Sequence, residues 1–489
     1  MLPFNLQKKQ YSFFKKKLLL PIFVVLSVSA CTAILSTDYD KTVGAKAAKQ
    51  VSAQMGLYQP LEMQQYVNNV GQRLVKELDN NQFTFQFKIV DDATPNAFAL
   101  PGGYIYISRG LLALLMNEDE LACVLAHEIT HVTQRHSVQQ MSSNIVPSII
   151  KIPGNIVGLF SDQLGNLINT PINAGNNLFL SRYSRGHETE ADTLGITLAA
   201  KAGYKPTSMS HILTRLNDTI EFTSQETQEK SYFDSHPYTP DRVKNVQQVS
   251  KSLTTVERAP IDLSFPDKLD GLVFEENPAN GIFQASLFLQ PSMGFTMEFP
   301  AQWALYNQPQ AVIAMREKEQ AFIALSGTGN KYSALENVTK FQEAFKKEYD
   351  KELTYKEINF EWGGKGYLIT LQDKGQSVLF LWLDFNKTTM QISSVAPHAF
   401  KKKLMASALS FKPITQQQIA SINEKVLRVV KAKDHEDIKT LKQREHGIEE
   451  LEYTILINDL NKDQPLKKDQ KVKIIKEQPF TDDLLFKKQ

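Results

Sequence analysis

The sequence has only two cysteines in 489 residues, so at most one disulfide is possible and a disulfide scaffold is excluded. Glycine and proline are also modest, at 23 and 21 residues, which excludes collagen-like and low-complexity chains. Lysine and arginine number 55 against 53 acidic residues, so no basic excess indicates a nucleic-acid partner. The length and the 42% hydrophobic content instead suffice for about two to four globular domains.

Acidic residues are missing from the first thirty positions, which carry five lysines. The apolar run that follows these lysines, Leu18 to Val28, is shorter than the roughly 20 residues of a membrane-spanning helix. A positive flank, a short apolar run and small residues are typical of a secretory signal peptide, predicted here over 1–30. The five lysines exceed the formal net charge of +2, so the remaining chain is mildly acidic.

Cys31 directly follows the small residues Ser29 and Ala30. This stretch resembles the lipobox of bacterial lipoproteins, which implies that Cys31 becomes an acylated N-terminus anchored in a membrane. Thr32, rather than aspartate, at the next position resembles the outer-membrane sorting class. The alternative is an ordinary secreted protein with a cysteine near its cleavage site. If Cys31 is acylated, Cys123 has no disulfide partner.

Apolar periodicity predicts a mainly helical segment over 31–255 that contains a small sheet. A strand is expected over Phe83–Ile89 and a hairpin around Pro101-Gly102-Gly103. Residues 141–180 are apolar but interrupted by proline and glycine, and we expect short helices and loops that could cover a groove or pack within the domain. The expected helices are Tyr39–Met55, Leu61–Leu78, Leu111 to about Gln140, and about His187 to Ala200.

The pattern changes near Pro260 to short alternating segments, interrupted by a helix over Leu335–Tyr349. This pattern predicts a separate antiparallel α+β domain over 262–412, followed by a third unit over 425–477. The overall fold class is therefore α+β. The three tryptophans, Trp303, Trp362 and Trp382, are expected in the core of the middle domain.

The segment His127-Glu128-Ile129-Thr130-His131 places two histidines at i and i+4 on one helix face. Both imidazoles can then reach one zinc ion, and Glu128 stands beside the site as a general base. Asn117, with Glu120 three residues on, resembles a capping box, so the helix is expected independently of the motif. The alternative is a core helix with two satisfied histidines, which would be costly without a role.

A third zinc ligand must come from elsewhere, and the helix after Arg185 offers His187, Glu188 and Glu190. Glu188 is favoured because Asp192 lies four residues later on the same face, where it could orient a ligand imidazole. Glu190 is expected to be solvated or to form a structural ion pair.

His236 precedes Pro237 and is therefore expected in a turn. It could polarise the reaction intermediate, occupy the fourth zinc position, or simply be a surface histidine. Arg242 could support the same site or pair with an acid. Cys123 shares a helix face with His127 but is favoured as a small buried hydrophobe, and His136 and His211 receive no role.

Together these motifs resemble the gluzincin metallopeptidase family that includes HtpX and the CAAX prenyl protease, in particular its periplasmic subgroup of beta-barrel assembly-enhancing proteases. The resemblance rests on residues 96–103, 127–131 and 188–192, and on 235–237 with Arg242. It implies one Zn²⁺ at His127, His131 and Glu188, with a regulatory role for His236. It also implies an edge strand that pairs with the substrate backbone by strand addition. This strand consists of Asn96, Ala97, Phe98, Ala99 and Leu100.

The segment Val429–Lys476 resembles a LysM domain, a module that binds N-acetylglucosamine polymers such as peptidoglycan. The resemblance is carried by the stretch from Asn458 to Ile474 and by two expected helices before it, Asp437–Glu445 and Ile448–Leu456. Lys433 stands where the module usually has glycine. A purely structural βααβ unit is therefore the alternative to a glycan-binding one.

The sequence thus predicts a lipid-anchored zinc endopeptidase on the periplasmic side of the bacterial envelope. Catalytic roles are expected for Glu128, His236 and Arg242. Expected substrates are unfolded or misassembled periplasmic and outer-membrane proteins, and peptidoglycan is a possible second partner. A non-catalytic, peptidoglycan-tethered scaffold or chaperone is the alternative from another class.

Overall fold

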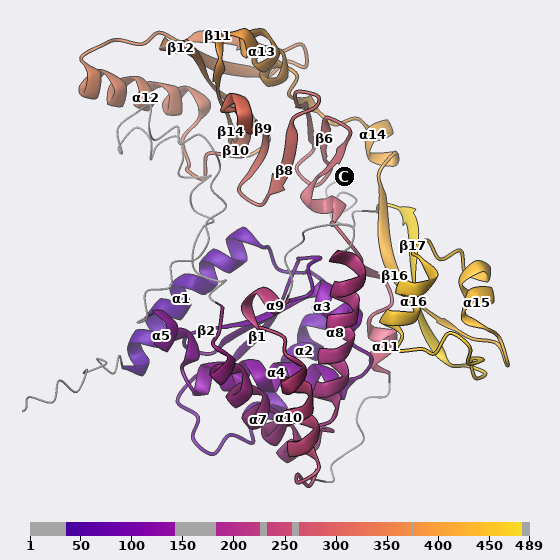
Figure 1. The fold of residues 1–489 in the computed structure, drawn as a ribbon. Coiled ribbons are helices and arrows are strands. Elements are labelled where there is room, and N and C mark those ends of the chain that lie inside the picture. The colour runs from indigo at the N-terminus through magenta and orange to yellow at the C-terminus, as the bar shows by residue number, and fades with distance from the viewer. Residues whose placement is uncertain (1–35, 142–181, 225–231, 257–263, 374, 482–489) are drawn as a thin grey trace, which may run out of the picture. The chain divides into compact units, whose positions relative to one another are not determined.

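A computed structural model describes residues 36–141, 182–224, 232–256, 264–373 and 375–481 (Figure 1). The expected signal peptide, the acylation site Cys31 and nearly all of the 141–180 segment lie outside the described residues. Within the described ranges, none of the helices combines the length and the apolar character that crossing a bilayer requires.

The first region is mainly helical and contains a small three-stranded sheet of order β1-β3-β2. Strand β1 pairs parallel to β3, and β2 pairs antiparallel to β3 through the expected hairpin. Gly102 and Gly103 in that hairpin have φ values of 84° and 105°, a conformation that glycine adopts without strain. The elements are α1 Thr37–Gln54, α2 Leu61–Val75, β1 Gln86–Val90, β2 Ala97–Leu100, β3 Tyr104–Ser108, α7 Arg185–Lys201, α8 Ser208–Ser224, α9 Tyr232–Ser235 and α10 Pro240–Ser250.

The single helix expected from Leu111 to about Gln140 is instead three helices: α3 Arg109–Leu114, α4 Glu118–Thr133 and α5 His136–Met141. The chain is extended at Leu115, and the Asn117 side chain then accepts a hydrogen bond from the Glu120 amide, which caps α4. Arg135, at a φ of 57°, ends the helical path before α5. These breaks follow local backbone and cap geometry that apolar spacing does not record.

The following region is rich in sheet. A seven-stranded antiparallel sheet has the order β11-β12-β13-β14-β10-β9-β8, and a four-stranded sheet has the order β15-β7-β6-β5. Helix α12 packs through Phe341 on one face of the larger sheet, and the smaller sheet shares the core on its other face. The elements are α11 Phe265–Lys268, β4 Leu272–Val273, β5 Ile282–Gln284, β6 Leu287–Gln290, β7 Phe295–Glu298, β8 Ala304–Gln308, β9 Ala311–Arg316, β10 Ala321–Gly327, α12 Ala334–Tyr349, β11 Lys356–Asn359, β12 Lys365–Asp373, β13 Gln376–Phe385, β14 Thr388–Pro397, α13 Lys401–Leu409, β15 Lys412–Pro413 and α14 Gln416–Ala420.

The tryptophans occupy these cores, as the sequence predicts. Trp303 belongs to the core between the two sheets, Trp382 to the core beneath α12, and the partly buried Trp362 packs against the first of these. The described part of the chain is thus a mixed α+β fold, helical first and then sheet-rich.

The last elements follow one another as β16 Asn423–Lys431, α15 Ile438–Arg444, α16 Leu451–Ile457 and β17 Lys471–Pro479. The two strands pair antiparallel, and β4 adds to β16 as a third strand. Apolar side chains of this unit, including Leu427, Ile457 and Ile475, belong to the same hydrophobic core as α4. Buried Lys473 donates hydrogen bonds to the carbonyls of Ala113 and Leu115, at the C-terminal end of α3.

Candidate metal centre

Helix α4 carries the two motif histidines through the interior, and all its residues from Glu118 to Val132 are buried. Three acidic residues occupy its first turn, where the positive end of the helix dipole stabilises their negative charge. Glu120 also forms a two-pronged ion pair with buried Arg215 of α8, at 2.7 and 3.0 Å. The Glu120–Arg215 ion pair thus helps to hold the helix in position without a contribution from metal.

Four side chains converge at one point: His127 and His131 of α4, Glu188 of α7, and His236, which directly follows α9. The two motif histidines approach through their Nε2 atoms at 3.0 Å. Glu188 Oε1 lies 3.4 Å from His131 Nε2, and His236 Nδ1 lies 3.3 Å from His127 Nε2. One possible ligand atom from each residue lies within 4.8 Å of the others, and all four are fully buried. This cluster can hold one metal ion.

Glu128 lies beside the cluster, and both its carboxylate oxygens are buried without a hydrogen-bond partner. Its Oε1 lies 3.6 Å from His236 Nε2. Burial raises the pKa of Glu128, although His236 and His127 act in the opposite direction. A buried carboxylate with free oxygens and a raised pKa suits a general base acting on a water molecule, and two imidazoles with a carboxylate suit zinc.

The electrostatics of the cluster favour metal binding. Burial lowers the pKa of His131 well below its usual value, so the imidazole is neutral, the form that binds metals. Burial opposes ionisation of Glu188, but His236, His131 and Arg242 together hold its pKa well below the usual range. For His236, burial favours the neutral ring, yet Glu188 and Glu128 raise its pKa.

Asp192 and Arg242 contact the candidate ligands His127 and Glu188. Asp192 lies one turn after Glu188 in α7, and its Oδ1 faces His127 Nδ1 at 3.0 Å. Arg242 of α10 contacts Asp192 through two nitrogens, at 2.7 and 2.8 Å, and Glu188 at 2.6 Å. Its guanidinium also donates to the carbonyls of His236 and Pro237. Arg242 therefore pairs with two acids and ties the His236 turn to the same site.

Helix α7 approaches α4 very closely where Gly195 faces the first motif histidine. A Cβ at this position would lie 2.9 Å from the His127 amide nitrogen and 3.0 Å from its Cα. Figure 1 shows α7 beside α4 and α10. Because Gly195 has no side chain, α7 can approach α4 closely enough for Glu188 to reach His127 and His131.

Three residues around the cluster escaped the sequence prediction. His136 is fully buried, and its Nδ1 lies 3.0 Å from His131 Nδ1. The Tyr183 ring stacks on His131 with centroids 3.9 Å apart, and the Tyr232 ring stacks on His236 at 4.4 Å. The signal available for His136 was a third histidine five residues after the motif.

The other expected site residues fall in several places. Strand β2, with Ala97, Phe98 and Ala99, lies at the edge of its sheet beside α4, and its side chains are buried. Asn96 precedes the strand, and its side-chain oxygen is buried without a hydrogen-bond partner. Cys123 is a buried free thiol outside the four-residue cluster.

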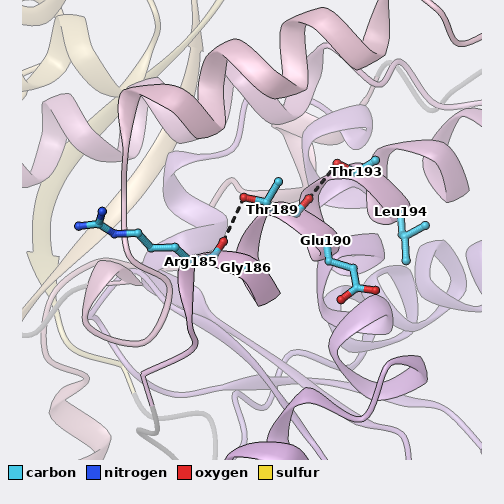
Figure 2. Close-up of a pocket in the computed structure, with 6 residues that line it drawn as sticks. All are labelled: Arg185, Gly186, Thr189, Glu190, Thr193 and Leu194. Carbon is cyan, nitrogen blue, oxygen red and sulfur yellow. Dashed lines mark hydrogen bonds between the residues drawn. The ribbon is translucent and has the colours of Figure 1, made fainter.

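A surface hollow lies on the outer side of α7, and none of the four clustered residues lines it (Figure 2). Glu190 lines the hollow, and the Thr189 and Thr193 hydroxyls there donate hydrogen bonds to backbone carbonyls one turn earlier. Glu188 and Asp192 of the same helix are buried. The helix therefore separates an exposed polar face from the metal-binding face.

The cluster has the ligand set of zinc metallopeptidases of the His-Glu-x-x-His type, with a glutamate from a second helix. Residues 62–250 match the family described as Peptidase family M48. The class predicted from the motifs is confirmed, and the metal cluster is typical of zinc-dependent members.

Two curated relatives illustrate the similarity. The beta-barrel assembly-enhancing protease of Yersinia pestis is 34% identical over 198 residues, 40% of this chain and 40% of that protein. The mitochondrial metalloendopeptidase OMA1 of Schizosaccharomyces pombe is 29% identical over 219 residues, 44% of this chain and 62% of that protein. The matches therefore span less than two thirds of either relative.

Among solved structures, the solution structure of cyanobacterial PsbP from Synechocystis sp. PCC 6803 is 15% identical, with a TM-score of 0.20. That match covers 27% of this chain and 95% of the other. A likeness of this size carries no functional argument.

Proposed function

We propose that the protein is a zinc-dependent endopeptidase of the bacterial envelope that degrades misfolded or misassembled periplasmic and outer-membrane proteins. The observation that carries the proposal is the buried convergence of His127, His131 and Glu188, with the unpartnered Glu128 carboxylate beside it. The proposed location in the envelope and the proposed substrates are inferred from the similarity to a relative named as a beta-barrel assembly-enhancing protease.

The roles follow from the positions of the side chains. One zinc ion bound by His127, His131 and Glu188 would supply Lewis acidity toward a water molecule and a peptide carbonyl. Glu128 takes the proton of the attacking water and passes it to the leaving amine, because its oxygens are free and its pKa is raised by burial. Asp192 orients the His127 ring.

His236 can act in two ways from its position in the cluster. Its Nδ1 lies 3.2 Å from Glu188 Oε1 and 3.3 Å from His127 Nε2, within reach of a metal held by these residues. As a fourth ligand it would exclude the water and hold the enzyme inactive. With its ring turned toward the substrate, it would stabilise charge that develops on the carbonyl oxygen.

The central test combines zinc analysis with cleavage of unfolded casein by the wild type, Glu128→Gln and His236→Ala. His211→Ala serves as a matched control, since His211 is an exposed histidine of α8. We expect Glu128→Gln to keep zinc and lose cleavage by about 10²–10⁴-fold, as general-base removal does. Equal cleavage by Glu128→Gln and the wild type would refute the mechanism.

The same measurements decide between catalysis and the alternative, a non-catalytic envelope scaffold or chaperone. If the wild type binds zinc without cleaving and His236→Ala cleaves, the enzyme is gated by His236. If no variant cleaves, the scaffold alternative is favoured.

Three further parts of the proposal concern anchoring and recognition. We propose that acylated Cys31 anchors the protein in the outer membrane, which incorporation of labelled palmitate into the wild type but not Cys31→Ser would support. We propose that β2, the edge strand of its sheet, receives the substrate backbone.

The third part is that the unit from β16 to β17 binds peptidoglycan. Co-sedimentation of the full-length protein with peptidoglycan, released by soluble N-acetylglucosamine oligomers, would support this role. Absence of co-sedimentation would leave a structural role for the unit.

A further inference from the structure

His131 has a polar contact on each ring nitrogen. Its Nε2 faces His127 and Glu188 in the metal cluster. Its Nδ1 lies 3.0 Å from Nδ1 of His136, the first residue of α5. The far side of His136 is also occupied, since its Nε2 lies 3.2 Å from a carboxylate oxygen of Glu190. A chain of hydrogen-bonding groups therefore runs from Glu190 through His136 to the metal ligand.

The chemistry of neutral imidazole allows one arrangement of protons along this chain. With Nε2 of His131 as the metal-binding atom, its proton resides on Nδ1 and must be donated. His136 Nδ1 is then the acceptor, so the His136 proton resides on Nε2. That proton is donated to Glu190, whose carboxylate only accepts hydrogen bonds.

We propose that His136 is a positioning residue that fixes the tautomer and ring orientation of the metal ligand His131, and that Glu190 in turn fixes the tautomer of His136. The inference rests on the proposed zinc site. The first ligand, His127, is oriented differently, because its Nδ1 faces the carboxylate of Asp192 directly. The two imidazole ligands thus receive their orientation from separate elements of the fold.

The two positioning residues differ in their surroundings. His136 is fully buried, and the His187 ring stacks on it with centroids 4.3 Å apart and an interplanar angle of 11°. The Glu190 side chain is 48% exposed and lines the hollow in Figure 2. Water can partly replace Glu190 as an acceptor, but it cannot readily replace His136. We therefore expect the larger effect from His136.

The competing explanation is that His136 only fills space beside His131 and His187. Two substitutions in the full-length protein separate the explanations. His136→Phe keeps an aromatic ring for stacking and lacks an acceptor. His136→Asn loses the ring, and its Oδ1 can occupy the place of Nδ1 and accept the His131 proton.

The measurements are zinc affinity, by competition with a chromophoric chelator, and the thermal unfolding of the metal-free protein. We expect His136→Phe to unfold near the wild-type temperature and to bind zinc about 10–100-fold more weakly. His136→Asn should bind zinc more tightly than His136→Phe despite a lower unfolding temperature. The inference is overturned if His136→Phe binds zinc like the wild type, or if His136→Asn binds it no better than His136→Phe.

A second pair decides the question if His136→Phe does not fold. Glu190→Gln keeps an acceptor for His136 Nε2, whereas Glu190→Leu removes it from a partly exposed position. We expect Glu190→Leu to bind zinc more weakly than Glu190→Gln, and equal affinities would overturn the inference. Because zinc affinity is read without any substrate, failure of this inference is separate from a failure to cleave protein.

Discussion

Replacing Gly195 by alanine tests the close approach of the two helices that carry the metal ligands. The added Cβ would lie 2.9 Å from the amide nitrogen and 3.0 Å from Cα of His127, and 3.2 Å from the Ala126 carbonyl carbon. Ordinary van der Waals contact begins at 3.4 Å, so α7 must move away from α4 by several tenths of an ångström. The contacted atoms belong to the backbone and cannot rotate aside.

The expected magnitude combines two opposing terms. Alanine is better than glycine inside a helix by about 1 kcal/mol. Overpacking a close interior contact costs about 1–3 kcal/mol. We therefore expect a net loss of up to about 2 kcal/mol in the free energy of unfolding. Zinc affinity should fall by about tenfold or more, because Glu188 moves relative to His127.

The measurements are urea unfolding of the metal-free protein and zinc competition with a chelator. Gly186→Ala is a matched control in the same helix, because among the described residues its Cβ would meet only the Ser184 hydroxyl, at 3.7 Å. The control should be neutral or slightly stabilised, with wild-type zinc affinity. The reasoning is refuted if Gly195→Ala matches the control in both measurements.

Three other predictions concern the metal, a buried ion pair and pH. Chelation should lower the unfolding temperature, since zinc at about 1,000 times its dissociation constant contributes about 4 kcal/mol, and His127→Ala should abolish the difference. Arg215→Leu leaves Glu120 buried without its partner and should cost about 3–5 kcal/mol in urea unfolding, with a loss below about 1 kcal/mol contradicting the pairing. Despite burial, Arg242 holds the pKa of Asp192 below its usual 3.8. The metal-free wild type should therefore lose its advantage over Asp192→Asn as the pH falls below about 4 in urea titrations, and a constant difference would argue against this pairing.

The metal-binding helices could be predicted because their signals are local. His127 and His131 share a helix face by spacing alone, and Asn117 marks the start of that helix in the sequence as it does in the structure. The choice of Glu188 also used a local relation, its i and i+4 pairing with Asp192. In the structure both carboxylates meet the α4 histidines and Arg242.

The contacts that escaped prediction depend on where the chain turns. His136 reaches His131 only because Arg135 adopts a φ of 57° and starts a new helix, and no periodicity indicates such a turn. Tyr183 and Tyr232 stack on ligand histidines that lie far from them in the sequence. Likewise, no spacing rule could indicate that Lys473 donates to carbonyls at the C-terminal end of α3.

The three tryptophans all lie in the sheet-rich region, in or against its two cores, while the rings stacked on the metal-cluster histidines are those of Tyr183 and Tyr232. Indole fluorescence is therefore an optical probe of a region that lies outside the four-residue metal cluster. A zinc-induced shift in the melting curve followed at tryptophan wavelengths would mean that both regions unfold cooperatively. Two separate transitions would mean that the peptidase melts on its own.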